Sequence, residues 1–185
     1  MAIKTFTTGE LLTAADTNTY LANSGLVLVK SQTVTGGAGV SSVTVSDAFN
    51  STYDNYVVLY TGGTCSTATG LNLALGSSTS TYYQVLIYGS YAGSGPSLAI
   101  TNNNRVAWSW CGAGNTTFVA MNVTLMQPFT TYYTRIIGNT YDGNDASGSM
   151  QGIHKSSTSY SAFTLTTEAG NMIGGTITVY GYRKG

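Results

Sequence analysis

Charge is what this chain has least of. Only 8% of its residues are charged, against roughly 25% in a typical soluble domain, and 7 Lys+Arg balance 7 Asp+Glu. Proteins that bind nucleic acid draw affinity from clustered Lys and Arg side chains, which neutralise phosphates. Here the basic residues are scattered, and only Arg183 and Lys184 are adjacent. The composition therefore predicts no nucleic-acid partner.

Long apolar runs are also missing. No stretch approaches the roughly 20 residues that a membrane-spanning helix requires, and no basic amphipathic segment favours a membrane surface. Met1 is not followed by the charged and apolar regions of a secretion signal. We therefore expect neither membrane insertion nor secretion by such a signal.

Residue types that carry out catalysis or bind metals are few. His154 is the single histidine, and no Gly-x-Ser-x-Gly nucleophile elbow accompanies it, so we expect an exposed histidine at a strand end. Cys65 and Cys111 are too few for a four-cysteine zinc site. They are interpreted as two small buried or half-buried thiols, and a disulfide between them is left open. The sequence predicts no metal and no cofactor.

Acidic side chains offer one remaining route to catalysis, because glycosidases use a pair of carboxylates. Here the candidates all lie in or beside turn-rich segments, where Asp is favoured for its hydrogen bonds to the backbone. They are Asp47, Asp54, Asp142, Asp145 and Glu168. The stretch 142–145 is interpreted as a plain hairpin turn rather than a calcium site. We expect no catalytic residues and no enzyme.

From residue 26 onward the chain has the composition of a β-protein, with 14 Tyr and 23 Gly beside abundant Thr and Ser. Short segments of alternating or continuous apolar residues recur between turn clusters. The expected strands are 26–34, 40–45, 55–61, 71–75, 83–88, 105–111, 117–126, 132–141, 149–155, 162–167 and 175–182. The spacing predicts an antiparallel β-sandwich with jelly-roll-like topology.

The first 25 residues differ from the rest. Thr13 is a good N-cap with Asp16 three residues later, which predicts a short helix from about residue 14 to 22 after an extended arm. We divide the chain into an arm and helix, residues 1–25, and a sandwich, residues 26–185. The apolar residues expected to attach the chain or join its copies are Leu11, Leu12, Ala14, Tyr20 and Leu21.

Tyrosine is the residue type most able to contact a ligand. Tyr82, Tyr83 and Tyr91 flank one loop and are the candidate ligand contacts, while Tyr132 and Tyr133 begin a strand. Flat amphipathic rings suit both interfaces and sugar faces. Contact between subunits is the favoured reading, with plain packing and glycan contact as alternatives. Trp108 and Trp110 share one face of a strand, which we expect to be the core.

Both ends of the chain resemble small virion proteins of tailed bacteriophages. The likeness lies in the segment Thr13-Ala-Ala-Asp-Thr-Asn-Thr-Tyr-Leu21, in Ser51-Thr-Tyr-Asp-Asn-Tyr-Val57, and in Gly174-Gly-Thr-Ile-Thr-Val-Tyr-Gly-Tyr-Arg183. In that group an arm precedes a Ser/Thr/Gly-rich β-domain. The resemblance is specific for a phage structural protein and does not decide its place on the particle.

The resemblance implies a projecting fibre or tip subunit in the virion, attached by its arm to other virion proteins. It further implies a homotrimer, a role in adhesion to the host surface through a glycan, and no catalytic residues. Two alternatives remain open. One is capsid decoration, and the other is a carbohydrate-binding module that works as a monomer.

Overall fold

The structure, a computed structural model, describes residues 7–16, 25–93, 97–141 and 146–183. Within these ranges the chain forms one short helix and twelve antiparallel strands, which confirms the all-β prediction. They are α1 (Ala14–Asp16), β1 (Leu26–Thr33), β2 (Ser42–Val45), β3 (Tyr53–Cys65), β4 (Thr69–Leu75), β5 (Tyr82–Ser90), β6 (Ser97–Arg105), β7 (Trp108–Gly114), β8 (Val119–Met126), β9 (Thr134–Tyr141), β10 (Ala146–His154), β11 (Phe163–Thr167) and β12 (Met172–Arg183). No helix in the described ranges is long and apolar enough to cross a membrane.

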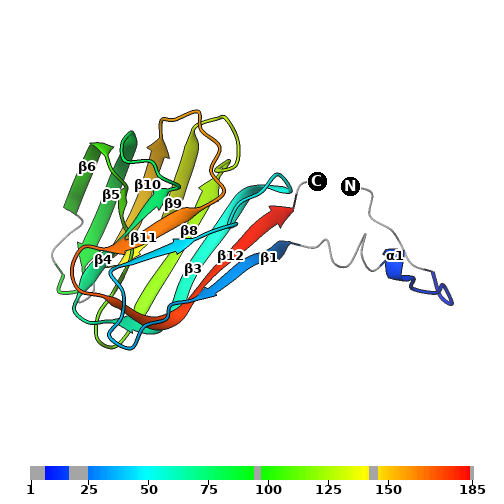
Figure 1. The fold of residues 1–185 in the computed structure, drawn as a ribbon, viewed down its shortest axis with the longest axis horizontal. Coiled ribbons are helices and arrows are strands. Elements are labelled where there is room, and N and C mark those ends of the chain that lie inside the picture. The colour runs from blue at the N-terminus through cyan, green and yellow to red at the C-terminus, as the bar shows by residue number, and fades with distance from the viewer. Residues whose placement is uncertain (1–6, 17–24, 94–96, 142–145, 184–185) are drawn as a thin grey trace.

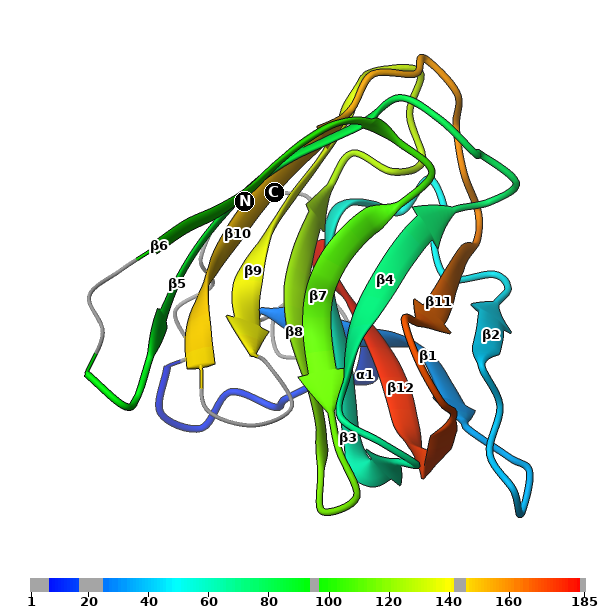
Figure 2. The same ribbon diagram turned by 90° about the vertical axis from the view of Figure 1, so that its left-hand side faces the viewer.

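The strands form two layers that share one continuous hydrogen-bonded network. The larger layer has the order β1-β12-β3-β8-β9-β10-β5-β6, and the smaller one has the order β2-β11-β4-β7. The layers join where the start of β8 pairs with β7, through Met121 opposite Gly112. Figure 2 shows β2, β11, β4 and β7 in front of β1, β12 and β3.

The connectivity is that of a jelly roll. From β1 to β4, successive strands alternate between the two layers, with β1 and β3 in the larger layer and β2 and β4 in the smaller one. The same alternation holds for β7 and β11 in the smaller layer and for β8 and β12 in the larger one. Two inserted pairs, β5–β6 and β9–β10, extend the larger layer beyond β8. We call these four strands the wing. β1, which follows the arm, is at one edge of the larger layer, and β6 is at the other (Figure 1).

The core lies between the layers, and strands such as β2 and β4 contribute alternate side chains to it. Leu71, Leu73 and Leu75 of β4 are fully buried, as the alternation predicted. Phe49, which precedes β3, bridges the layers. Its ring centroid lies 4.8 Å from that of Tyr56 on β3 and 5.7 Å from that of Phe163 on β11. Such aromatic contacts add stability beyond the area they bury.

A buried amide fastens the wing to the smaller layer. The Gln84 side chain on β5 donates to the Ser109 carbonyl at 2.6 Å and accepts from the Ser109 N–H at 2.7 Å. Beside it, the rings of Tyr82 and Trp108 meet edge to face at 4.9 Å. Both contacts join β5 to β7, so the wing packs on the sandwich. Trp108 is in the core as expected, and Trp110 packs against it as a partly buried residue.

The sequence predicted no strand over residues 97–104, which belong to β6. In the arm, the predicted capping box is confirmed: Asp16 N–H donates to Thr13 Oγ1 at 3.1 Å, and Thr13 N–H donates to the Asp16 carboxylate at 3.2 Å. The described helix ends at Asp16. The remainder of the expected helix, with Tyr20 and Leu21, lies outside the described residues, as does the turn at 142–145.

Candidate functional site

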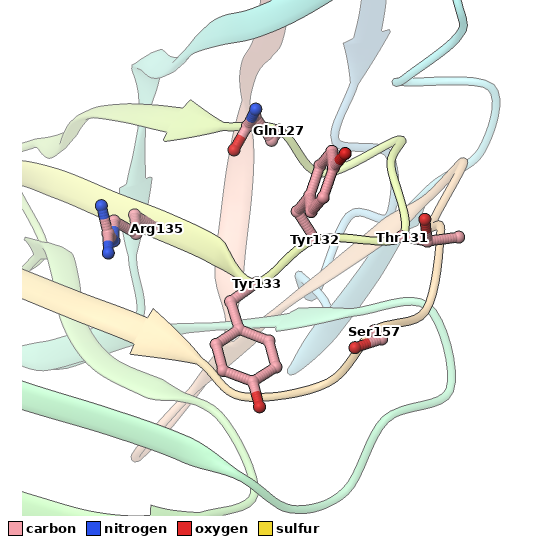
Figure 3. A pocket seen from close by; sticks show the side chains of 6 residues that line it. All are labelled: Gln127, Thr131, Tyr132, Tyr133, Arg135 and Ser157. Carbon is pink, nitrogen blue, oxygen red and sulfur yellow. The ribbon is translucent and has the colours of Figure 1, made fainter.

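An open pocket of about 450 Å³ lies at one end of the wing. We call it the tyrosine pocket. Its walls come from the loop between β8 and β9, from the first residues of β9 and from the segment that follows β10 (Figure 3). The lining residues are Gln127, Thr131, Tyr132, Tyr133, Arg135 and Ser157. Tyr132 and Tyr133 are well exposed, at 66% and 49%.

The first wall is held in shape by its own hydrogen bonds. Gln127 adopts a positive φ of 60°, which is uncommon for a residue with a side chain, and its N–H donates to the Asp54 carbonyl at 2.6 Å. Thr130 Oγ1 donates to the Gln127 carbonyl at 3.0 Å and accepts from the Tyr132 N–H at 3.3 Å. The loop that carries both tyrosines is therefore folded back on the end of β8.

The second wall is tied to the first and to the core. Tyr160 N–H donates to the Pro128 carbonyl at 2.9 Å, so the segment that carries Ser157 is joined to the first wall. The Tyr160 hydroxyl lies 2.9 Å from Nε2 of His154. These bonds fix the spacing of the two walls before any ligand arrives, which lowers the entropy lost on binding.

His154 is the buried support beneath the pocket, and the expectation of an exposed histidine was wrong. Its side chain is fully buried and stacks on Tyr82 with a centroid separation of 4.1 Å. Burial lowers the pKa of His154 because desolvation disfavours the charged imidazolium. The ring is therefore neutral at neutral pH.

Both imidazole nitrogens of His154 have a polar partner. Thr81 Oγ1 donates to the Ser80 carbonyl at 2.6 Å and lies 3.1 Å from His154 Nδ1. The Tyr160 hydroxyl lies 2.9 Å from Nε2 and donates to Ser156 Oγ at 3.4 Å. Thr81 has a φ of 68°, a strained value for a β-branched residue. The Thr81 carbonyl accepts a hydrogen bond from the Lys155 N–H at 3.0 Å.

The structure separates the three tyrosines expected to contact a ligand. Tyr82 is fully buried, and its hydroxyl accepts from the Leu75 N–H at 2.7 Å, so its assignment as a ligand contact is corrected. Tyr83, on the opposite face of β5, is half-buried with Lys155 Nζ 4.2 Å from its ring centroid. Tyr91 is highly exposed beyond the other end of β5, away from the pocket.

The two thiols and one carboxyl group of the domain have pKa values shifted by burial. Cys65 and Cys111 are both free and buried, and burial raises the pKa of each thiol. Burial also raises the pKa of Glu168, partly opposed by a hydrogen bond from Trp110 and the charge of Arg105. Among the described residues, no three His, Cys, Asp or Glu side chains gather in a way that would hold a metal ion.

The described attachment residues are available for contact. Leu11 is 81% exposed, Leu12 is 49% exposed, and Ala14 is exposed as well. All of residues 7–15 are exposed in the single chain. The arm therefore presents apolar side chains that the described part of the domain does not cover.

No protein-family model, curated protein or solved structure matches this chain. Within the sequence, the adjacent pair Tyr132-Tyr133 was the one signal of the tyrosine pocket. Ser157 was missed because it comes from a separate segment that only the fold brings to the pocket. Gln127 and Arg135 lie close to the two tyrosines in sequence, but no pattern there marked them as lining residues. The site therefore has to be interpreted from its geometry.

Proposed function

We propose that this chain is a structural subunit of a tailed-phage virion. In this proposal it is a projecting fibre or tip protein, held to other virion proteins by its N-terminal arm and involved in adhesion to the host surface. It acts by binding and assembly rather than by catalysis. The resemblance of both chain ends to small phage virion proteins supports it.

The observation that carries the proposal is the exposed arm beside a domain that closes its own core. Leu11 and Leu12 are exposed on the arm, whereas the jelly roll buries a continuous apolar interior. Exposed apolar side chains on a segment outside the core are favoured where a partner covers them. A subunit that is attached by its arm needs this division between arm and domain.

The tyrosine pocket supports the adhesive part of the proposal. It combines exposed aromatic rings, amide and hydroxyl groups, and one guanidinium within an open depression. Aromatic rings pack on the apolar faces of sugars, while polar side chains bond to their hydroxyls. A host-surface glycan is therefore the partner that we assign to this surface.

Capsid decoration remains a second candidate, favoured by the position of the pocket. β8 ends and β9 begins at the pocket. In the larger layer, β12 and β3 lie between β1 and β8. The antiparallel pairing of these strands places the start of β1 at the same end of the layer as the pocket. A domain that is fixed by its arm at this end would hold the pocket near its support. A decoration subunit needs no exposed binding tip.

Immunogold labelling of purified phage particles, with antibodies raised against this protein, tests the proposal. Labels at the tail tip or on tail fibres are expected for an adhesive subunit. Labels over the head would assign the protein to capsid decoration instead. Particles without labels, from a lysate that contains the protein, would contradict a virion role.

A further inference from the structure

The tyrosine pocket contains a positively charged side chain. Its described lining includes Arg135 and no carboxylate. A second depression of about 300 Å³ on the same layer is lined by amides, hydroxyls and apolar groups, without any charged side chain in its described lining. In a chain of zero net charge, a cation inside a pocket is a specific feature.

Arg135 is exposed, and it forms no ion pair with an Asp or Glu among the residues that the structure describes. The one acidic residue that the hydrogen bonds bring to the pocket rim is Asp54, which contributes its backbone carbonyl to Gln127 N–H. The guanidinium therefore keeps its five N–H donors in a fork that matches a carboxylate.

Lys155 adds a second cation beside the pocket. Thr134 and His154 are paired across β9 and β10, and Tyr133 and Lys155 are the next residues beyond this pair, so they lie side by side at the end of the ladder. Lys155 Nζ is held over the Tyr83 ring at 4.2 Å from its centroid. The rings of Tyr133 and Tyr83 thus alternate with the cations of Arg135 and Lys155 along this end of the wing.

We propose that the tyrosine pocket binds the carboxylated sugars of an acidic polysaccharide. This inference rests on the proposed adhesive function and specifies its ligand. Tyr132 and Tyr133 pack on sugar faces, while the Arg135 guanidinium holds a carboxylate by paired hydrogen bonds. Gln127, Thr131 and Ser157 donate to or accept from sugar hydroxyls, and Lys155 attracts the next carboxylate along the polymer.

The test measures binding of the purified full-length protein to alginate, a polymer of uronic acids, and to dextran, a neutral polymer. We expect binding to alginate that weakens as salt is raised, because salt screens exposed charges. Arg135→Gln should weaken alginate binding by roughly tenfold or more, as expected when a hydrogen bond to a charged group is lost. Tyr133→Ala should weaken it as well.

Two matched variants at exposed positions outside the pocket serve as controls. Arg183→Gln removes a guanidinium on β12, and Tyr88→Ala removes a phenol ring on β5. Neither should change alginate binding if the pocket is the site. An Arg183→Gln effect as large as that of Arg135→Gln would overturn the assignment, because only net charge would then matter.

The failure of this inference can be distinguished from failure of the proposed function. Equal binding of dextran and alginate, lost in Tyr133→Ala but kept in Arg135→Gln, would overturn the acidic ligand and leave glycan adhesion in place. Absence of binding to alginate and to hyaluronate, another polymer that contains uronic acid, would also overturn it. The virion role is decided separately, by the immunogold labelling.

Discussion

His154 shows how one residue links the core to the surface. Its imidazole is buried, stacks on Tyr82 and hydrogen-bonds to Thr81 and Tyr160, and Tyr160 joins the two walls of the tyrosine pocket. A protonated imidazolium would place a charge in the core, where burial disfavours it. The neutral ring is therefore part of the folded structure of the pocket.

We predict that stability falls with acidification through His154. Its folded-state pKa lies below the ordinary value of 6.5, so as the pH falls the unfolded chain takes up the proton first. The stability contributed by the neutral ring is fully present above pH 6.5 and is lost as the pH falls through the folded-state pKa. The free energy of unfolding should fall by up to about 1.4 kcal/mol per pH unit in this window.

Urea unfolding at several pH values, combined with NMR of the single imidazole, measures this dependence. Glu168 acts in the opposite sense, since its raised pKa gives stability below 4.5 that is lost as the pH rises through its folded-state value. The imidazole signal separates the two groups. A titration midpoint of His154 at or above 6.5 in the folded protein would contradict the prediction.

At the scale of strands, the junction between the layers depends on a glycine. A Cβ at Gly112 on β7 would lie 2.5 Å from the Ala120 carbonyl oxygen and 2.6 Å from Met121 Cβ, both on β8. We expect Gly112→Ala to lower the free energy of unfolding by about 1–3 kcal/mol, as overpacking does in a close-packed interior.

Gly89→Ala is the matched control for this prediction. Gly89 also lies in a strand, β5, and a Cβ there would meet nothing within 4 Å. Its free energy of unfolding should change by no more than about 0.5 kcal/mol. Urea denaturation compares the two variants. Equal losses would show that the close approach of β7 and β8 does not limit stability.

Most strands could be predicted because their apolar residues alternate, as in Leu71, Leu73 and Leu75. β6 was missed because it follows a Gly/Ser-rich stretch and ends in the polar run 102–104, while its pairing with β5 is a long-range property. An edge strand with one neighbour needs less apolar patterning than a central strand. The capping box at Thr13 was predictable because all its contacts are local.

β5 in the wing carries apolar residues on both faces and a polar residue on its buried face, which explains the error at Tyr82. Gln84 is buried on β5, whereas its neighbours Val85 and Ile87 are about half exposed. The Gln84 amide is accommodated because it bonds to both backbone groups of Ser109 on β7. A sequence pattern cannot indicate which face of a strand is buried when the backbone of a distant residue hydrogen-bonds to a buried polar side chain.

At the scale of the whole molecule, the arm continues into an exposed apolar edge. Leu26 on β1 pairs with Tyr182 on β12, Leu28 pairs with Tyr180, and Leu26, Leu28 and Tyr182 are exposed. Among the described strands, β1 pairs only with β12, so its other edge is open. An open apolar edge favours association, and here it follows the exposed leucines of the arm in the chain. We therefore expect copies of the chain to meet along the arm and β1.

The mass of the full-length protein in solution, measured by light scattering, tests this expectation most directly. We expect a trimer, three times the chain mass of 19.3 kDa. Leu11→Asp combined with Leu12→Asp should convert it to a monomer with an intact sandwich. Thr8→Asp combined with Ala15→Asp adds the same charge at exposed arm positions and should leave it trimeric. A monomeric full-length chain, or a trimer that survives the leucine substitutions, would contradict assembly through the arm.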